Sequence, residues 1–195
     1  MDKLYLIIFF IFGSVMGSFY HVIATRLSKE QSIIKPSSHC ENCHNKLKWY
    51  ELIPIISYLI QKGKCRHCHA KLPISYLLIE LCTGILFAVC YHVFDLSLEL
   101  IIALIFISSL ITIIISDIEY MIILDEVLIF ASFSIIILDI IDCGLYETAV
   151  KVLAGLGSFA TMYLVKKVGD MMFKQESLGG GDIKLMFLIG LVIGY

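Results

Sequence analysis

The sequence predicts an all-α, multi-pass membrane protein of about six transmembrane helices, the last of them truncated, with a cysteine-bearing cytoplasmic loop. Of its 195 residues, 59% are hydrophobic and only 16% are charged, whereas soluble domains carry about 25% charged residues. The mean hydropathy is +0.90, and the hydrophobic residues come in long blocks. These observations exclude a soluble globular domain and a disordered chain. A net charge of -2 gives no reason to expect nucleic-acid binding.

Six hydrophobic blocks are the candidate spans. The first has 22 residues without a formal charge, enough to cross a hydrocarbon core of about 30 Å. A cleaved signal peptide is the weaker alternative, because Lys3 is the only positive charge before the block, the block is too long, and basic residues follow it. The last block has only 11 residues, so either the sixth helix continues further or the chain ends in a half-helix. The blocks are residues 4–25, 72–94, 100–116, 121–138, 148–165 and 185–195.

The basic residues predict the orientation. Thirteen of the fifteen Lys and Arg side chains lie in residues 26–71 and 166–184, and none lies in 95–99 or 139–147. The positive-inside rule places the two basic segments in the cytoplasm and the N-terminus outside. We therefore expect a protein of the bacterial cytoplasmic membrane with three parts. They are a first transmembrane helix (1–25), a cytoplasmic loop with a four-cysteine zinc site (26–71) and a membrane core that looks incomplete at its C-terminus (72–195).

Four cysteines of the loop form two pairs with metal-ligand spacing. Two residues separate Cys40 from Cys43 and Cys65 from Cys68, and 21 residues lie between the pairs. Two such turns can supply the four thiolates of a tetrahedral Zn²⁺ site. Because the cytoplasm keeps thiols reduced, a disulfide is the weaker alternative, and a redox pair or free thiols stay open. The sequence therefore predicts one structural zinc ion.

Two carboxylates are expected at one depth of the membrane. Asp117 ends the third block and Asp182 precedes the sixth, so both fall at the cytoplasmic boundary. Two carboxyl groups brought together share one proton, so that the ionised group can take a proton from water while the protonated one polarises a carbonyl. The alternative is a set of solvated helix ends, which suits Glu119, Asp125 and Glu126 better.

The residues around Asp182 resemble a known motif. Gly179-x-Gly181-Asp182-x-Lys184, with Asp117 upstream at a helix end, looks like the site of the GxGD membrane aspartyl proteases. Further stretches, in order along nearly the whole chain, resemble one branch of them, the type IV prepilin peptidases with N-methyltransferase activity. These stretches are residues 17–19, 26–27, 38–58 and 63–81.

The resemblance implies an enzyme that removes the basic leader from type IV prepilins or pseudopilins on the cytoplasmic side. It also implies methylation of the new N-terminal amine with S-adenosylmethionine. The catalytic pair would be Asp117 and Asp182, supported by Gly179, Gly181 and Lys184. The implied partners are the prepilin and the lipid bilayer, and no nucleic acid is expected.

The methyl-donor site cannot be located from the sequence, because no glycine-rich nucleotide motif is present. Four residues in or near the polar loop are candidates: Arg26, Trp49, Tyr50 and Glu80. An aromatic face could attract the sulfonium cation.

The chain departs from the family pattern in three places. Glu41 follows Cys40 where proline is common, Leu124 replaces the proline before Asp125, and the family's final helices are missing beyond Tyr195. Two rival functions stay open. One is a cleavage-only GxGD protease, which would lack the cysteine loop, and the other is a non-catalytic zinc-knuckle scaffold of a pilus or secretion assembly. Ion transport is disfavoured, since only Glu80 lies well inside a predicted span.

Overall fold

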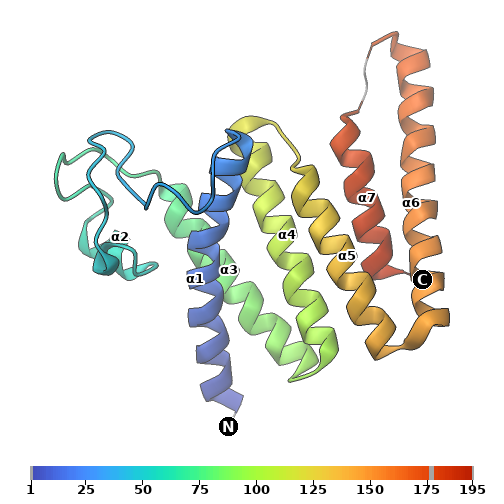
Figure 1. The fold of residues 1–195 in the computed structure, drawn as a ribbon, viewed down its shortest axis with the longest axis horizontal. Coiled ribbons are helices and arrows are strands. Elements are labelled where there is room, and N and C mark those ends of the chain that lie inside the picture. The colour runs from blue at the N-terminus through green and yellow to red at the C-terminus, as the bar shows by residue number, and fades with distance from the viewer. Residues whose placement is uncertain (1, 176–177, 195) are drawn as a thin grey trace. The chain divides into compact units, whose positions relative to one another are not determined.

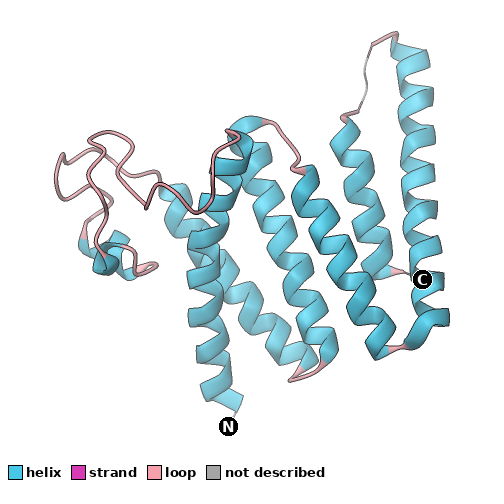
Figure 2. Ribbon diagram, viewed as in Figure 1, coloured by secondary structure: helices cyan, strands magenta, loops and turns pink. Residues whose placement is uncertain are grey.

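The computed structural model describes residues 2–175 and 178–194. It is all-helical in these ranges, as predicted, and Figure 2 shows helices joined by loops. The chain divides into two compact units, Met1–Leu96 and Ser97–Tyr195, which we describe separately. The first holds α1 (Asp2–Ser28), the short 3-10 helix η1 (Trp49–Glu51), α2 (Ile56–Ile60) and α3 (Ile74–Phe94). The second holds α4 (Leu98–Tyr120), α5 (Asp125–Asp142), α6 (Gly144–Phe173) and α7 (Gly180–Ile193) (Figure 1).

Four helices of the described residues are long and apolar enough to cross a bilayer. They are α1, α3, α4 and α6, with mean hydropathies from 1.4 to 2.8 over their best windows. The other two predicted spans also form helices, but α7 has only 14 residues. Helix α5 carries two carboxylates in its first turn and two more, Asp139 and Asp142, near its end. The four spans are confirmed by length and composition, whereas the count of six stays a prediction.

In the first unit, α1 packs closely against α3 because small residues line the crossing. A Cβ atom placed on Gly13 would lie 2.7 Å from the Thr83 carbonyl oxygen, and one on Gly17 would lie 2.8 Å from the Thr83 hydroxyl. Glycines four positions apart on one helix face allow two backbones to approach in this way. The stretch 39–71 departs from the pair as the cysteine loop, with two isolated β-bridges in place of strands.

In the second unit, α5 lies between α4 and the α6–α7 pair (Figure 1). The core is made of aliphatic side chains from α4, α5 and α7, including the fully buried Ile135, Leu188 and Leu191. Two helix boundaries differ from the sequence-based expectation. Helix α6 continues to Phe173, beyond the predicted end of the span at residue 165. Helix α7 begins at Gly180, so Asp182 belongs to its first turn and does not precede it.

Candidate active site and metal centre

Asp117 lies in the last turn of α4. Met121 ends that helix in the left-handed conformation, with φ 56° and ψ 34°, and its backbone N–H donates to the Asp117 carbonyl oxygen at 2.9 Å. The Asp117 side chain is exposed, whereas the neighbouring Ser116 is fully buried. The end of α4 therefore presents the Asp117 carboxylate outward and is anchored by the buried Ser116.

Asp182 lies in the first turn of α7, where the helix N-terminus favours negative charge. Its carboxylate turns back over Gly179, and a Cβ atom on that glycine would lie 3.1 Å from Oδ2 of Asp182. A larger residue at position 179 would therefore crowd the carboxylate. The glycine leaves the space in which the carboxyl group lies.

The first turn of α7 contacts the connection that follows Asp117. A Cβ atom on Gly181 would lie 2.6 Å from Cβ of Ile123, so only glycine allows this approach. One turn later, Nζ of Lys184 donates to Oδ2 of Asp125 at 2.6 Å, and both side chains are about half exposed. Figure 1 shows the end of α4 and the start of α7 at the same end of the second unit. The first turn of α7, which carries Asp182, thus packs against the connection that follows Asp117.

The same end of the second unit is rich in carboxylates. Asp117, Glu119, Asp125, Glu126 and Asp182 all lie on the last turn of α4 or the first turns of α5 and α7. Lys184 neutralises one of them. Such a surface attracts a basic peptide, and carboxylates of this kind can take part in acid–base chemistry.

The four loop cysteines come together from two turns of the same geometry. In each turn, the first cysteine carbonyl accepts a hydrogen bond from the residue four positions later, at 2.8 Å from His44 and 3.0 Å from His69. Both histidines have left-handed backbones, with φ 55° and 57°. The two Cys-x-x-Cys sequences therefore fold as matching knuckles, and the backbone of each of these histidines closes one of the turns.

The geometry of the sulfurs fits a metal ion. All four Sγ atoms, those of Cys40, Cys43, Cys65 and Cys68, lie within 4.8 Å of one another, and Cys40 and Cys68 are 3.8 Å apart. A tetrahedral site with Zn–S bonds of about 2.3 Å needs sulfurs about 3.8 Å apart. Hydrogen bonds from the Ala70 backbone and the Asn42 side chain lower the pKa of the Cys68 thiol to about 6. The cluster can thus hold a metal such as zinc.

The first unit also has a partly open cavity of about 660 Å³ between α1, α3 and the cysteine loop, within the range of small-molecule sites. Its lining carries both signs of charge and aromatic groups. Glu51, Glu80, Arg26, Lys71, Tyr58 and Tyr76 represent these three kinds. Such a mixture suits a zwitterionic ligand with a flat ring better than a purely apolar one.

Glu80 is a buried acid of this cavity that contacts both the loop and α1. It is 8% exposed, and its Oε2 accepts a hydrogen bond from the Ile55 backbone at 2.6 Å, with Ser18 of α1 as a second donor. Ile55 has φ 63° and ψ -56°, and the Ile56 N–H donates to the Pro54 carbonyl at 2.6 Å. This is the rare γ-turn that branched residues avoid. Glu80 therefore ties a strained turn of the loop to α1 and α3.

The other three candidates for the methyl-donor site have different surroundings. Arg26 lines the cavity, but its guanidinium donates to the carbonyls of Ser32, Ile33 and Pro36 and orders the start of the loop. Tyr50 has Arg66 at 5.3 Å from its ring centre and Lys48 at 5.8 Å, so protein cations already lie at its face. Trp49 is 77% exposed.

Sequence reasoning missed three contacts that build these sites: Ile123 with Gly181, Asp125 with Lys184, and Ile55 with Glu80. The partners are 25 to 59 positions apart, so no local pattern reveals them. A weak signal existed for the last pair. Residues 52–61 are uncharged within a strongly basic loop.

Together, these features define a helical, multi-pass membrane protein with a unit that carries four clustered cysteines and a helical unit rich in carboxylates. Residues 11–94 match the bacterial peptidase A24 N-terminal domain, and residues 104–195 match the type IV leader peptidase family. The chain belongs to the type IV leader peptidase family. The first match falls in the unit with the knuckles, and the second contains Asp117 and Asp182.

Similar proteins from three bacteria are named prepilin leader peptidase/N-methyltransferase. The one from Bacillus subtilis is 40% identical over 96% of this chain and 73% of its own length. That of Vibrio cholerae is 30% identical over 100% and 79%. That of Myxococcus xanthus is 31% identical over 96% of this chain, which spans 56% of that relative. No solved structure matches the chain.

Proposed function

We propose that the protein is a membrane aspartyl endopeptidase that removes the basic leader from type IV prepilins or pseudopilins, with Asp117 and Asp182 as its catalytic pair. The proposal rests on the close contact between Gly181 and Ile123. This contact joins the start of α7, where Asp182 lies, to the connection that follows Asp117. The family membership and the relatives' names support this reaction.

The reaction divides the work between the two carboxyl groups. The ionised carboxylate takes a proton from a water molecule while the oxygen of that water attacks the carbonyl carbon of the scissile bond. The protonated carboxyl polarises the carbonyl oxygen and gives its proton to the leaving amine nitrogen. The products are a leader that ends in a carboxylate and a pilin with a free N-terminal amine. Both aspartates stand on helix ends, which hold them more rigidly than loops would.

Single substitutions test the pair. Asp117→Asn and Asp182→Asn should each abolish cleavage of a purified prepilin while membrane insertion is retained, because an amide cannot act as the base. Asp142→Asn is the matched control, since Asp142 ends α5 at the opposite end of the unit. Near-normal cleavage by either motif variant would refute the assignment.

The knuckles are proposed to hold one structural Zn²⁺ through Cys40, Cys43, Cys65 and Cys68. Four thiolates close the coordination sphere, so the ion would brace the loop and leave no position for substrate. Zinc analysis of protein purified without chelator, paired with alkylation of the free thiols, tests this role.

The second proposed activity is methylation of the new pilin amine, for which bound S-adenosylmethionine supplies the methyl group. The cavity of the first unit is our candidate for its site, because its volume and mixed lining suit that molecule. Glu80 is proposed to accept hydrogen bonds from S-adenosylmethionine and to keep the Ile55 turn in place. Arg26 would act through the order of the loop.

Glu80→Gln separates donor binding from cleavage. The variant should bind S-adenosylhomocysteine about tenfold more weakly, since a hydrogen bond to a charged group contributes about 1.5–3 kcal/mol, and should still cut prepilin. Glu99→Gln, an exposed position in the first turn of α4, is the control. If Glu80→Gln binds S-adenosylhomocysteine normally, the binding site lies elsewhere in the protein. If the unmodified protein does not bind it at all, the methyltransferase proposal is refuted.

The topology expected from the charge pattern suits this substrate. Under the positive-inside rule, the knuckles and both aspartates face the cytoplasmic side of the bacterial cytoplasmic membrane, with the N-terminus outside. A prepilin carries a basic leader ahead of an apolar helix, so its cleavage point lies at this boundary. A non-catalytic scaffold needs neither Gly181 nor the seated helix end, and a cleavage-only protease needs no knuckle unit. For these reasons we favour the bifunctional enzyme.

A further inference from the structure

The segment between the two knuckles has an unusual polarity for a loop. Residues 52–61 carry no formal charge, although nine Lys and Arg residues lie in 26–71 around them. They form the γ-turn at Ile55 and the five-residue helix α2. A cytoplasmic loop of this composition would be expected to expose polar side chains and bury apolar ones.

Its side chains point in the opposite sense. Ser57, Tyr58 and Gln61 line the cavity of the first unit. Ile56, Leu59 and Ile60 face outward and are 55%, 60% and 64% exposed. Polar groups toward the protein and aliphatic groups away from it are the arrangement of a surface in contact with hydrocarbon. Leu4, Ile7 and Ile11 of the spanning helix α1 are exposed to a similar degree.

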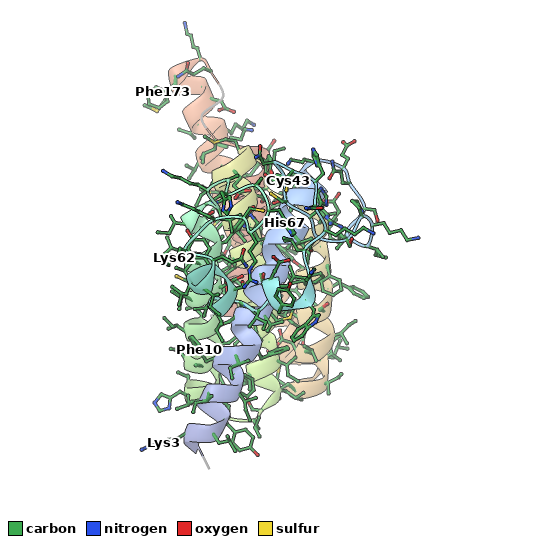
Figure 3. The ribbon with its side chains drawn as sticks, turned by 90° about the vertical axis from the view of Figure 1, so that its left-hand side faces the viewer. Lys3, Phe10, Cys43, Lys62, His67 and Phe173 are labelled. Carbon is green, nitrogen blue, oxygen red and sulfur yellow. The ribbon has the colours of Figure 1, made fainter. Side chains whose placement is uncertain are left out.

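The depth of the segment agrees with this polarity. Ile55 hydrogen-bonds Glu80, which stands in the second turn of the spanning helix α3. That position is about 9 Å along the helix axis from the first residue. Figure 1 shows α2 level with the C-terminal half of α1, not beyond its end. In Figure 3, Lys62 lies between Phe10 of α1 and the knuckle residues Cys43 and His67.

The flanks of the segment have the chemistry of a lipid headgroup boundary. Trp49 stands before the apolar stretch and is 77% exposed, which suits the interfacial preference of tryptophan. Lys46 and Lys48 precede it, and Lys62 and Lys64 follow it. Lysines so placed bind the phosphates of anionic lipids.

We infer that residues 52–61 are embedded in the same leaflet as the ends of α1 and α3 near the knuckles. Ile56, Leu59 and Ile60 contact acyl chains there, with Trp49 and the flanking lysines at the headgroups. Lipid is favoured over a protein partner because the outward residues continue the exposed aliphatic surface of the neighbouring spans and are bracketed by cations. The outer wall of the cavity would then lie in the bilayer surface.

The single tryptophan makes the inference measurable. The whole protein is reconstituted in phosphatidylcholine vesicles containing phosphatidylglycerol. Its fluorescence is quenched either by phosphatidylcholine brominated on the acyl chains or by acrylamide in the water. Trp49→Phe combined with Leu59→Trp moves the reporter to the outward face of α2. The same background with Ile11→Trp gives a bilayer reference, and with His67→Trp an aqueous one.

The native Trp49 and the Leu59→Trp reporter should lose intensity with brominated lipid, and Leu59→Trp should resist acrylamide as Ile11→Trp does. The His67→Trp reporter should show the reverse. Quenching of Leu59→Trp by acrylamide alone would overturn the inference, because the segment would then lie in water. Protection from both quenchers would also overturn it, since protein would then cover the face. Neither measurement depends on cleavage or methylation.

Discussion

Replacing Gly181 by alanine tests how the catalytic helix end is seated. The added Cβ atom would lie 2.6 Å from Cβ of Ile123 and 3.0 and 3.1 Å from two further atoms of that side chain. Carbon atoms are most stable about 3.5–4.0 Å apart. The start of α7 and the connection after α4 must therefore separate by about 1 Å for ordinary contact to be restored.

The displacement should affect activity much more than stability. Overpacking costs about 1–3 kcal/mol, and about 1 kcal/mol of this is offset because alanine is the better helix former. Asp182 follows Gly181 directly, however, so its carboxylate moves with the backbone. A misplacement of about 1 Å can reduce a rate about 100-fold. We expect Gly181→Ala to fold and insert, and to cut prepilin about 100-fold more slowly.

The neighbouring glycine supplies the matched control. A Cβ atom on Gly180 meets nothing within 4 Å, so Gly180→Ala changes the same motif by the same group and should retain cleavage. Combining Gly181→Ala with Ile123→Gly removes the obstructing side chain and should recover part of the rate. The assay is the rate of prepilin shortening by protein reconstituted at equal concentration. Equal rates for Gly180→Ala and Gly181→Ala would refute the steric argument.

Two further predictions concern the ion pair and the knuckles. Lys184→Asp or Asp125→Lys alone should slow cleavage with little loss of stability, because a half-exposed pair contributes only about 0.2–1 kcal/mol. The double variant, in which the two charges are exchanged, should restore the rate of cleavage. If it does not, the ion pair has no role in cleavage. Cys43→Ser with Cys68→Ser should release the zinc and reduce methylation more than cleavage in mass spectra of the pilin N-terminus, and equal losses would make the loop a brace for both activities.

Local and compositional features of the sequence predicted much of the architecture. Long hydrophobic blocks predicted α1, α3, α4 and α6, because a spanning helix must be predominantly apolar over its length. Paired cysteine spacing predicted the metal-capable cluster, since a knuckle needs only a short turn around two thiolates. Both signals are local or compositional, so one chain suffices to read them.

Contacts between distant residues could not be predicted in the same way. The basic character of residues 26–71 indicated a solvated loop, but the direction in which Ser57 and Leu59 point depends on the Ile55–Glu80 hydrogen bond across 25 positions. The continuation of α6 to Phe173 is likewise not signalled by hydropathy, because Lys166, Lys167 and Asp170 interrupt the apolar sequence there. A contact between distant residues decides the first of these two features.

The structure gives a physical reason for every position of the Gly-x-Gly-Asp-x-Lys motif. Gly179 leaves room for the Asp182 carboxylate, Gly181 seats the helix on Ile123, and Lys184 pairs with Asp125. The unspecified positions follow as well. A Cβ atom at residue 180 would meet nothing within 4 Å, so the contacts there do not require glycine. Ile183 is buried, which favours an apolar side chain. The motif therefore encodes the docking of one helix end onto another, with the Asp182 carboxylate lying over Gly179.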